Sequence, residues 1–248
     1  MRWRRVSIRP VYHLSSSIRN LSTTIMEHTD LTLKAEINLY YDLVVPDGSV
    51  NAPLLVAVHG YGAHKRYMMR EAKLIAPENF VIASIQGPHQ HFRQTPDGYR
   101  IGFGWLTEHQ PEEYVRLHHD FVLRVIDRLS AEGLVDRTKI YLYGFSQACA
   151  LNLRFAFTNP SVPRGVIGVC GGIPGDLDSN PIYSPFSADT LYLYGDDDEF
   201  YSQEKFVGFE TKLRELLPNF HSKQYHAKHE ITNEMREDIR AFLRNEKG

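Results

Sequence analysis

Short apolar runs alternate with helix-like segments along most of this chain, and this alternation limits the possible folds more than any other feature of the sequence. Residues 53–58 (PLLVAV) are apolar without a break, which is typical of a strand buried on both faces. Residues 111–129 carry apolar side chains at a period of about 3.6 residues, which predicts an amphipathic helix. Because alternating strands and helices form right-handed βαβ units, we predict an α/β fold with a mostly parallel central sheet flanked by helices. The predicted strands are residues 53–58, 81–85, 140–143, 166–169, 190–194 and 223–225, and the predicted helices are residues 65–75, 111–129, 147–157, 203–217 and 232–243.

Two further segments are predicted from local composition. Residues 31–45 alternate loosely between apolar and polar side chains and end in the turn Pro46-Asp47-Gly48, which predicts two antiparallel strands. Residues 88–104 are polar and contain Pro96, Asp97 and Gly98, so we predict a long loop there. No shift of composition divides residues 27–248, and we therefore expect one domain.

The first 25 residues differ from the rest. They contain five arginines and no acidic residue, and serine and threonine are frequent. This composition is typical of an organelle transit peptide, although Pro10 interrupts the amphipathic helix that such peptides form. The alternative is an extended gene start, with translation beginning at Met26. The first interpretation predicts a mitochondrial protein and the second a cytoplasmic one, and both leave residues 1–25 out of the fold.

Charge and cysteine usage exclude several classes of partner. The formal net charge is −2, so no overall basic field favours nucleic acid. No run of apolar residues is long enough for a transmembrane helix, so we expect no integral membrane association. Cys149 and Cys170 have apolar neighbours, which predicts buried free thiols in a reducing compartment. No spacing of Cys and His resembles a zinc site, and no metal is expected.

The segment from Ile140 to Cys149 carries the strongest chemical signal. A predicted strand runs directly into Gly144-Phe145-Ser146-Gln147-Ala148 and then into a predicted helix. This is the setting of a nucleophile elbow, a sharp turn that holds a serine in strained backbone geometry with its hydroxyl pointing out of the sheet. Gly144 is needed because a side chain there would clash across the turn. The plain alternative is that Ser146 is only the N-cap of a helix.

Four segments in this order resemble the phospholipase/carboxylesterase family, the branch of α/β-hydrolases that includes acyl-protein thioesterases. They are Val58-His-Gly-Tyr-Gly62, Gly144-Phe-Ser-Gln-Ala148, Gly195-Asp-Asp-Asp198 and His229 before the last helix. Ala148 departs from the family, which has a second glycine there, and Tyr194 stands where histidine is frequent. The resemblance implies an α/β-hydrolase fold over roughly residues 33–245, a single domain without a large lid, and a serine esterase that needs no cofactor.

A serine hydroxyl needs a base with a pKa near neutrality, which in practice is histidine. In this fold the base follows the acid, which follows the serine. Three histidines come after Ser146. We favour His229 because it lies on a short loop before the helix predicted from residue 232, whereas His221 precedes the last predicted strand. His226 directly follows that strand and is the second choice. We expect other lone histidines, including His118 and His119, to be solvated.

The acid is expected in the loop after the strand predicted at residues 190–194. Asp196, Asp197, Asp198 and Glu199 follow one another there, and most of such a run consists of turn formers and solvated charges. The family pattern Gly-x-x-Asp implies Asp198, with Asp197 as the second choice. The role of this acid would be to accept a hydrogen bond from the Nδ1–H group of the histidine and to stabilise the imidazolium.

The resemblance also implies the residues around the substrate carbonyl. The oxyanion donors would be the backbone amides of Tyr61 and Gln147, and the latter stands at a helix N-terminus, where negative charge is favoured. Gly60 and Trp105 would belong to the substrate pocket, and residues 88–106 would form part of its rim. On the residues alone, a plain strand-to-loop turn at residues 58–62 and a core position for Trp105 remain alternatives.

These features together predict hydrolysis of small carboxylic esters or thioesters through Ser146, His229 and Asp198, with an acyl-enzyme intermediate and no metal or organic cofactor. A lysophospholipase, a peptidase on the same fold and a non-catalytic ligand binder are the alternatives. The sequence leaves open whether the chain acts as a monomer or a homodimer.

Overall fold

The computed structural model describes residues 27–244. The chain divides into two units, Met1–Ile37 and Asn38–Gly248. In the first unit, residues 27–37 are exposed and contain neither a helix nor a strand. The segment interpreted as a transit peptide or an extended start, residues 1–25, lies outside the described residues. All helices and strands of residues 27–244 belong to the second unit.

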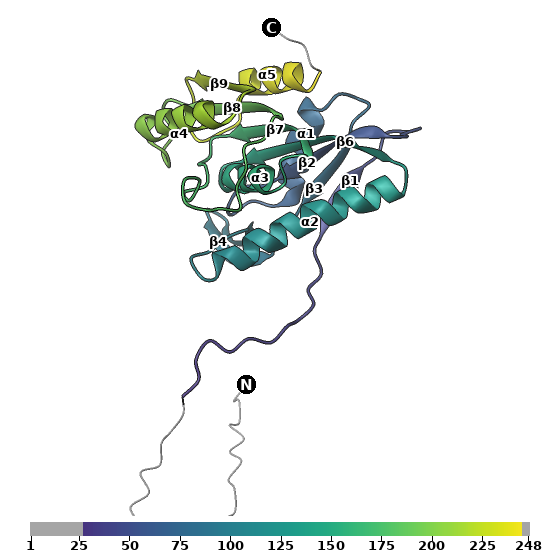
Figure 1. The fold of residues 1–248 in the computed structure, drawn as a ribbon. Coiled ribbons are helices and arrows are strands. Elements are labelled where there is room, and N and C mark those ends of the chain that lie inside the picture. Colours follow the sequence, from purple (N-terminus) through teal and green to yellow (C-terminus); the bar gives the residue numbers. More distant parts are fainter. Residues whose placement is uncertain (1–26, 245–248) are drawn as a thin grey trace, which may run out of the picture. The chain divides into compact units, whose positions relative to one another are not determined.

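The second unit is built on a seven-stranded sheet with the strand order β1-β3-β2-β6-β7-β8-β9 (Figure 1). Only β1 is antiparallel to its neighbour, so the predicted mostly parallel α/β architecture is confirmed. Most strands extend the predicted ones by a few residues, chiefly at the polar ends that the apolar pattern did not cover. The strands are β1 (Tyr41–Val44), β2 (Ala52–Val58), β3 (Val81–Ile85), β6 (Val135–Phe145), β7 (Pro163–Val169), β8 (Asp189–Gly195) and β9 (Phe220–Tyr225).

Five helices cover the two faces of this sheet, and each predicted helix is present within two residues at either end. They are α1 (Lys65–Ile75), α2 (Pro111–Ala131), α3 (Gln147–Thr158), α4 (Gln203–Leu216) and α5 (Asn233–Leu243). Side chains alternate along a strand, so Leu54 and Val56 belong to the apolar layer that includes residues of α2, α3 and α4, whereas Leu55 belongs to the layer that includes residues of α1 and α5. The sheet therefore lies between two apolar layers, and both faces of its central strands are buried (Figure 1).

The prediction of a long loop at residues 88–104 is wrong. The segment forms an antiparallel hairpin, β4 (His89–Thr95) and β5 (Gly98–Gly104), which turns at Gly98 with a φ of 112°. Its strands escaped the prediction because most of their side chains are exposed, so they lack a continuous apolar run. A bridge between Ala63 and Phe103 attaches the hairpin to the loop that follows β2.

The prediction of two antiparallel strands in residues 31–45 is also wrong. The segment contains only β1, whose partner is β3 rather than a second strand nearby. The side chains of Leu31, Leu33 and Ile37 are exposed. No apolar burial therefore stabilises a second strand in this segment. None of the helices in residues 27–244 is both long and apolar enough to span a bilayer.

Two histidines expected to be solvated lie in the core instead. His118 and His119 are 1% and 8% exposed on the inner face of α2, where their rings contact Trp105 and Phe155. Their place on the apolar stripe of α2 was the available signal. Burial holds the pKa of His118 well below its usual value and that of His119 at about 4. The prediction of buried free thiols at Cys149 and Cys170 is confirmed.

Candidate active site

Ser146 stands at the turn between β6 and α3. Its φ of 57° and ψ of −120° are strained for a residue with a side chain. Its N–H donates to the carbonyl of Val169 at 2.9 Å, which ties the turn to the neighbouring strand. A Cβ at Gly144 would lie 2.8 Å from the Ala148 carbonyl oxygen and from Asn152 Nδ2. Only glycine therefore lets α3 turn back so closely on β6, and the methyl of Ala148 is accommodated.

A chain of hydrogen bonds joins Ser146, His229 and Asp198, which come from three separate loops. His229 Nε2 lies 2.8 Å from Ser146 Oγ, and His229 Nδ1 lies 2.7 Å from Asp198 Oδ2. The ionised carboxylate has no proton to donate, so Nδ1 carries one and Nε2 is left to accept the serine proton. The His229 side chain is 10% exposed and the Asp198 side chain 0% exposed, so water has little access to the second bond.

The loops that carry His229 and Asp198 are fixed to each other. Asp198 Oδ1 accepts the backbone N–H groups of Phe200 at 2.8 Å and of Tyr201 at 3.0 Å, which orients the carboxylate. The N–H of His229 donates to Glu199 Oε2 at 3.0 Å. A Cβ at Gly195 would lie 2.1 Å from the Ala227 carbonyl oxygen, so only glycine allows the two loops to approach this closely.

The second-choice residues do not join this chain of bonds. His226 is exposed, and its Nδ1 lies 3.2 Å from both carboxylate oxygens of Asp196. His221 lies on β9 with an exposed side chain. Asp197 donates its N–H to the carbonyl of Ala227 and serves the turn. The structure thus brings together the three residues favoured from the sequence and leaves their rivals outside.

The loop after β2 runs beside Ser146. A Cβ at Gly60 would lie 2.9 Å from the Ser146 Cβ, so this loop reaches the serine only through a glycine. Among the described residues, neither the N–H of Tyr61 nor that of Gln147 donates to a protein group. Both amides therefore remain available to an acceptor outside the chain. The Tyr61 side chain is exposed, and its ring stacks on His91 of β4 at 4.6 Å.

Residues 40–246 match the family described as Phospholipase/Carboxylesterase. The chain belongs to the phospholipase/carboxylesterase family. The resemblance seen in the four sequence motifs is thereby confirmed, and the family is one of esterase-type hydrolases. A curated relative, NocK of Nocardia uniformis subsp. tsuyamanensis, is 27% identical over 157 residues, which are 62% of this chain and 41% of that protein. The chain thus spans less than half the length of this relative.

Solved structures with low sequence identity share the fold. The esterase PE8 has a TM-score of 0.67 at 20% identity, covering 84% of this chain and 99% of the other. The Bacillus cereus carboxylesterase has a TM-score of 0.65 at 14% identity, covering 84% and 94%. Zea mays acyl-protein thioesterase 2 has a TM-score of 0.61 at 17% identity, covering 84% and 99%. The predicted α/β-hydrolase fold is therefore confirmed.

In this member of the phospholipase/carboxylesterase family, His59 supports the loop beside Ser146. Its Nδ1 donates to the Gly60 carbonyl at 2.8 Å, and its Nε2 accepts the Gly87 N–H at 2.9 Å. Burial lowers the pKa of His59 to about 4, so the ring stays neutral and keeps both roles. Sequence reasoning gave His59 no role, although it stands in the motif that was singled out.

Trp105 lies behind the site rather than in it. Its side chain is 2% exposed, and its indole N–H donates to the carbonyl of His59 at 2.9 Å. Its backbone N–H donates to Gln147 Oε1 at 2.9 Å, and Gln147 Nε2 donates to the Leu106 carbonyl at 3.2 Å. Trp105 therefore belongs to the core that holds the site, which was the plain alternative for a tryptophan.

A metal centre is not formed by the side chains that the structure describes: residues 27–244 hold no group of three or more His, Cys, Asp or Glu side chains arranged for an ion.

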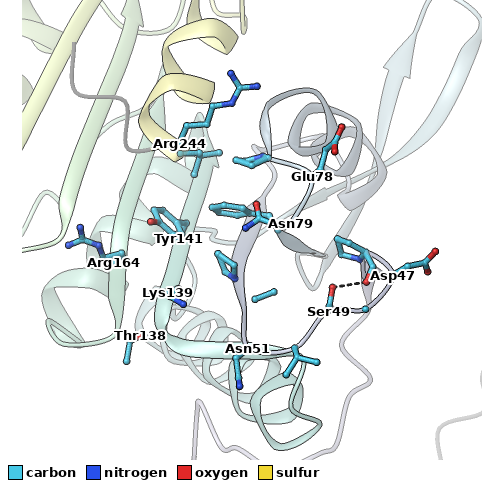
Figure 2. A pocket seen from close by; sticks show the side chains of 18 residues that line it. Asp47, Ser49, Asn51, Glu78, Asn79, Thr138, Lys139, Tyr141, Arg164 and Arg244 are labelled. Carbon is cyan, nitrogen blue, oxygen red and sulfur yellow. Dashed lines mark hydrogen bonds between the residues drawn. The ribbon is translucent and has the colours of Figure 1, made fainter.

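A cavity of about 1020 Å³ lies at the end of the sheet where β2 and β7 begin (Figure 2). Ser146 directly follows the last residue of β6, at the opposite end of the sheet. The cavity is lined by the turn after β1 and by the start of β6, including Asn51, Lys139 and Tyr141. None of the residues around Ser146 lines it. Ligands of open parallel sheets bind beyond the carboxyl ends of the strands, where Ser146, Asp198 and His229 lie. The carboxyl ends of the strands are therefore the candidate site, and this cavity is not part of it.

Proposed function

We propose that this chain is a serine hydrolase that cleaves carboxylic esters or thioesters through an acyl-enzyme intermediate. The observation that carries the proposal is the hydrogen-bonded series from Ser146 Oγ through the His229 ring to Asp198. Ser146 would be the nucleophile, His229 the general base and Asp198 the acid that orients the base. A ligand binder would need neither of these two bonds, whereas acyl transfer uses both of them.

In the first step Ser146 Oγ attacks the substrate carbonyl carbon while His229 Nε2 takes the serine proton. The imidazolium that forms is stabilised by Asp198, which stays ionised. Because the Asp198 side chain is fully buried, the field between the two charges is little screened by water.

The negative charge on the tetrahedral oxygen would be met by the free N–H groups of Tyr61 and Gln147. Both amides are held in place before the substrate binds. The loop of Tyr61 is fixed by the hydrogen bond of His59 to Gly60 and by the bridge between Ala63 and the hairpin. Gln147 is fixed because it is the first residue of α3. The positive end of the α3 dipole favours charge at the same point. One such donor stabilises the transition state by about 3 kcal/mol.

His229 then gives its proton to the leaving alcohol or thiol, and water attacks the acyl-enzyme by the same route. These steps use only protein groups and water, so the proposal includes no metal or organic cofactor. Carboxylesterase and acyl-protein thioesterase are the names of two solved structures with this fold, which supports esters and thioesters as the substrate class.

The proposal is tested by labelling the protein with a fluorophosphonate probe, which reacts only with an activated serine. We expect the wild type to be labelled and Ser146→Ala to lose both labelling and hydrolysis of 4-nitrophenyl acetate while its circular dichroism is unchanged. Ser187→Ala removes an exposed serine and serves as the matched control. Labelling that persists in Ser146→Ala would refute the assignment of the nucleophile.

A further inference from the structure

Phe200 is exposed and contacts the ring of His229, and the acyl-transfer steps proposed above require neither property. Its side chain is 68% exposed, although burying a phenyl ring of this size would be favourable by about 2 kcal/mol. Its ring also meets the ring of His229 edge to face, with the centroids 4.7 Å apart and an interplanar angle of 63°. A single exposed phenylalanine needs no explanation, but one in contact with the base lies at the reacting atoms.

The position of Phe200 is fixed by the site itself. Its backbone N–H donates to Asp198 Oδ1 at 2.8 Å, and the next residue, Tyr201, donates to the same oxygen. Phe145 contacts the His229 ring as well, at 4.9 Å. The imidazole is thus supported by other rings, and the exposed surface of Phe200 remains open beside it.

Proton transfer decides which part of the substrate meets this surface. The leaving oxygen or sulfur must reach His229 Nε2 to take its proton, so the alcohol or thiol portion lies next to the imidazole. The acyl portion lies on the side of Ser146 and the free amides. A group attached to the leaving atom therefore approaches Phe200.

The loop that carries Phe200 is rich in carboxylates, and Glu199 also interacts with Lys228 of the neighbouring loop. Glu199 precedes Phe200, and hydrogen bonds from its own N–H and from that of His229 lower the pKa of Glu199, so this carboxylate is ionised at neutral pH. Asp196 and Asp197 lie in the same loop. An apolar chain gains contact with the phenyl ring, whereas a carboxylate is repelled by Glu199.

We infer that Phe200 is a specificity-determining residue that selects esters and thioesters of apolar alcohols or thiols. This inference rests on the proposed function and names the leaving group it favours. It predicts that the wild type prefers hexyl acetate to 6-acetoxyhexanoate, which has the same chain ending in a carboxylate, and to methyl acetate.

The test measures kcat and KM for these three acetates by release of acetate. Phe200→Ala is expected to lower kcat/KM for hexyl acetate fivefold to tenfold, mainly by raising KM, and to change methyl acetate by less than twofold. Phe200→Leu keeps an apolar side chain and should retain the preference. Leu74→Ala removes another exposed apolar side chain, on α1 and outside the site, and is the control variant; its kcat/KM should stay unchanged for all three esters.

A loss of the same size on all three esters would show that Phe200 only supports the imidazole and would overturn the inference. An unchanged preference in Phe200→Ala would overturn it too. A wild type that hydrolyses none of these esters and resists the fluorophosphonate probe would refute the proposed function instead, so the two failures can be told apart. Circular dichroism of each variant confirms that it is folded.

Discussion

At the scale of single residues, the site depends on which atom of each side chain carries a proton. Asp198 uses Oδ1 to accept two backbone N–H groups and Oδ2 to accept His229 Nδ1. The two bonds to Oδ1 fix the orientation of the carboxylate, and the bond to Oδ2 fixes the tautomer of the His229 ring. The four crowded acids could be sorted from the sequence only by the family pattern, because composition does not show which carboxylate is buried.

Asp198→Asn is expected to keep the fold and lose most of the activity. Its amide oxygen would stay with the two backbone N–H groups, so its NH₂ would face His229 Nδ1 and force the proton onto Nε2. The ring could then no longer accept the serine proton. We expect kcat to fall by about 10³- to 10⁴-fold, measured with 4-nitrophenyl acetate.

The neighbouring Asp197→Asn is the control for this variant, because Asp197 contributes only a backbone bond to the turn. Its activity should stay within about twofold of the wild type. If the two variants lost activity equally, Asp198 would have no special role.

At the scale of elements, helices and buried strands were predictable, and exposed strands were not. α1 was predicted at its observed bounds, and its buried residues include Met68, Ala72 and Ile75, which lie on one helical face. The hairpin of β4 and β5 was missed because its apolar and aromatic residues are separated by polar residues and glycines, so no continuous apolar run marks it. Its structure depends on attachment to the loop after β2, a long-range contact that local patterns do not contain.

Helix α2 buries His118 against Trp105, and among the described residues neither ring nitrogen of His118 has a hydrogen-bond partner. Burial lowers the pKa of His118, so below the unfolded value near 6.5 the unfolded chain binds more protons and stability falls as the pH falls. We expect His118→Leu to reduce the loss of unfolding free energy between pH 7.5 and pH 5 by about 1 to 2 kcal/mol, measured by urea denaturation.

His221→Leu is the control variant, because it also replaces a histidine with leucine but at an exposed position. Its stability should follow the pH dependence of the wild type. An unchanged pH dependence in His118→Leu would mean that His118 is protonated or hydrated in the folded state, contrary to this account.

At the scale of the whole molecule, the parallel sheet brings distant residues to one edge. Ser146 follows β6, Asp198 follows β8 and His229 follows β9, so three carboxyl ends meet in one place. The predicted parallel sheet and the chain order of serine, acid and histidine made this meeting predictable from the sequence. The support by His59 and the ring of Phe200 beside His229 were not predicted, because they depend on which loops pack together in three dimensions, and the sequence alone did not decide between the core and the pocket for Trp105.

The central claim is that Ser146 carries the acyl group between two half-reactions. It is tested most directly by mixing the protein with 4-nitrophenyl acetate, quenching with acid within the first turnovers and mapping the peptides by mass spectrometry. We predict one acetyl group on the peptide that contains Ser146, absent from Ser146→Ala. A protein that hydrolyses the ester while every peptide stays unmodified, or while the acetyl group lies on another residue, would contradict the account.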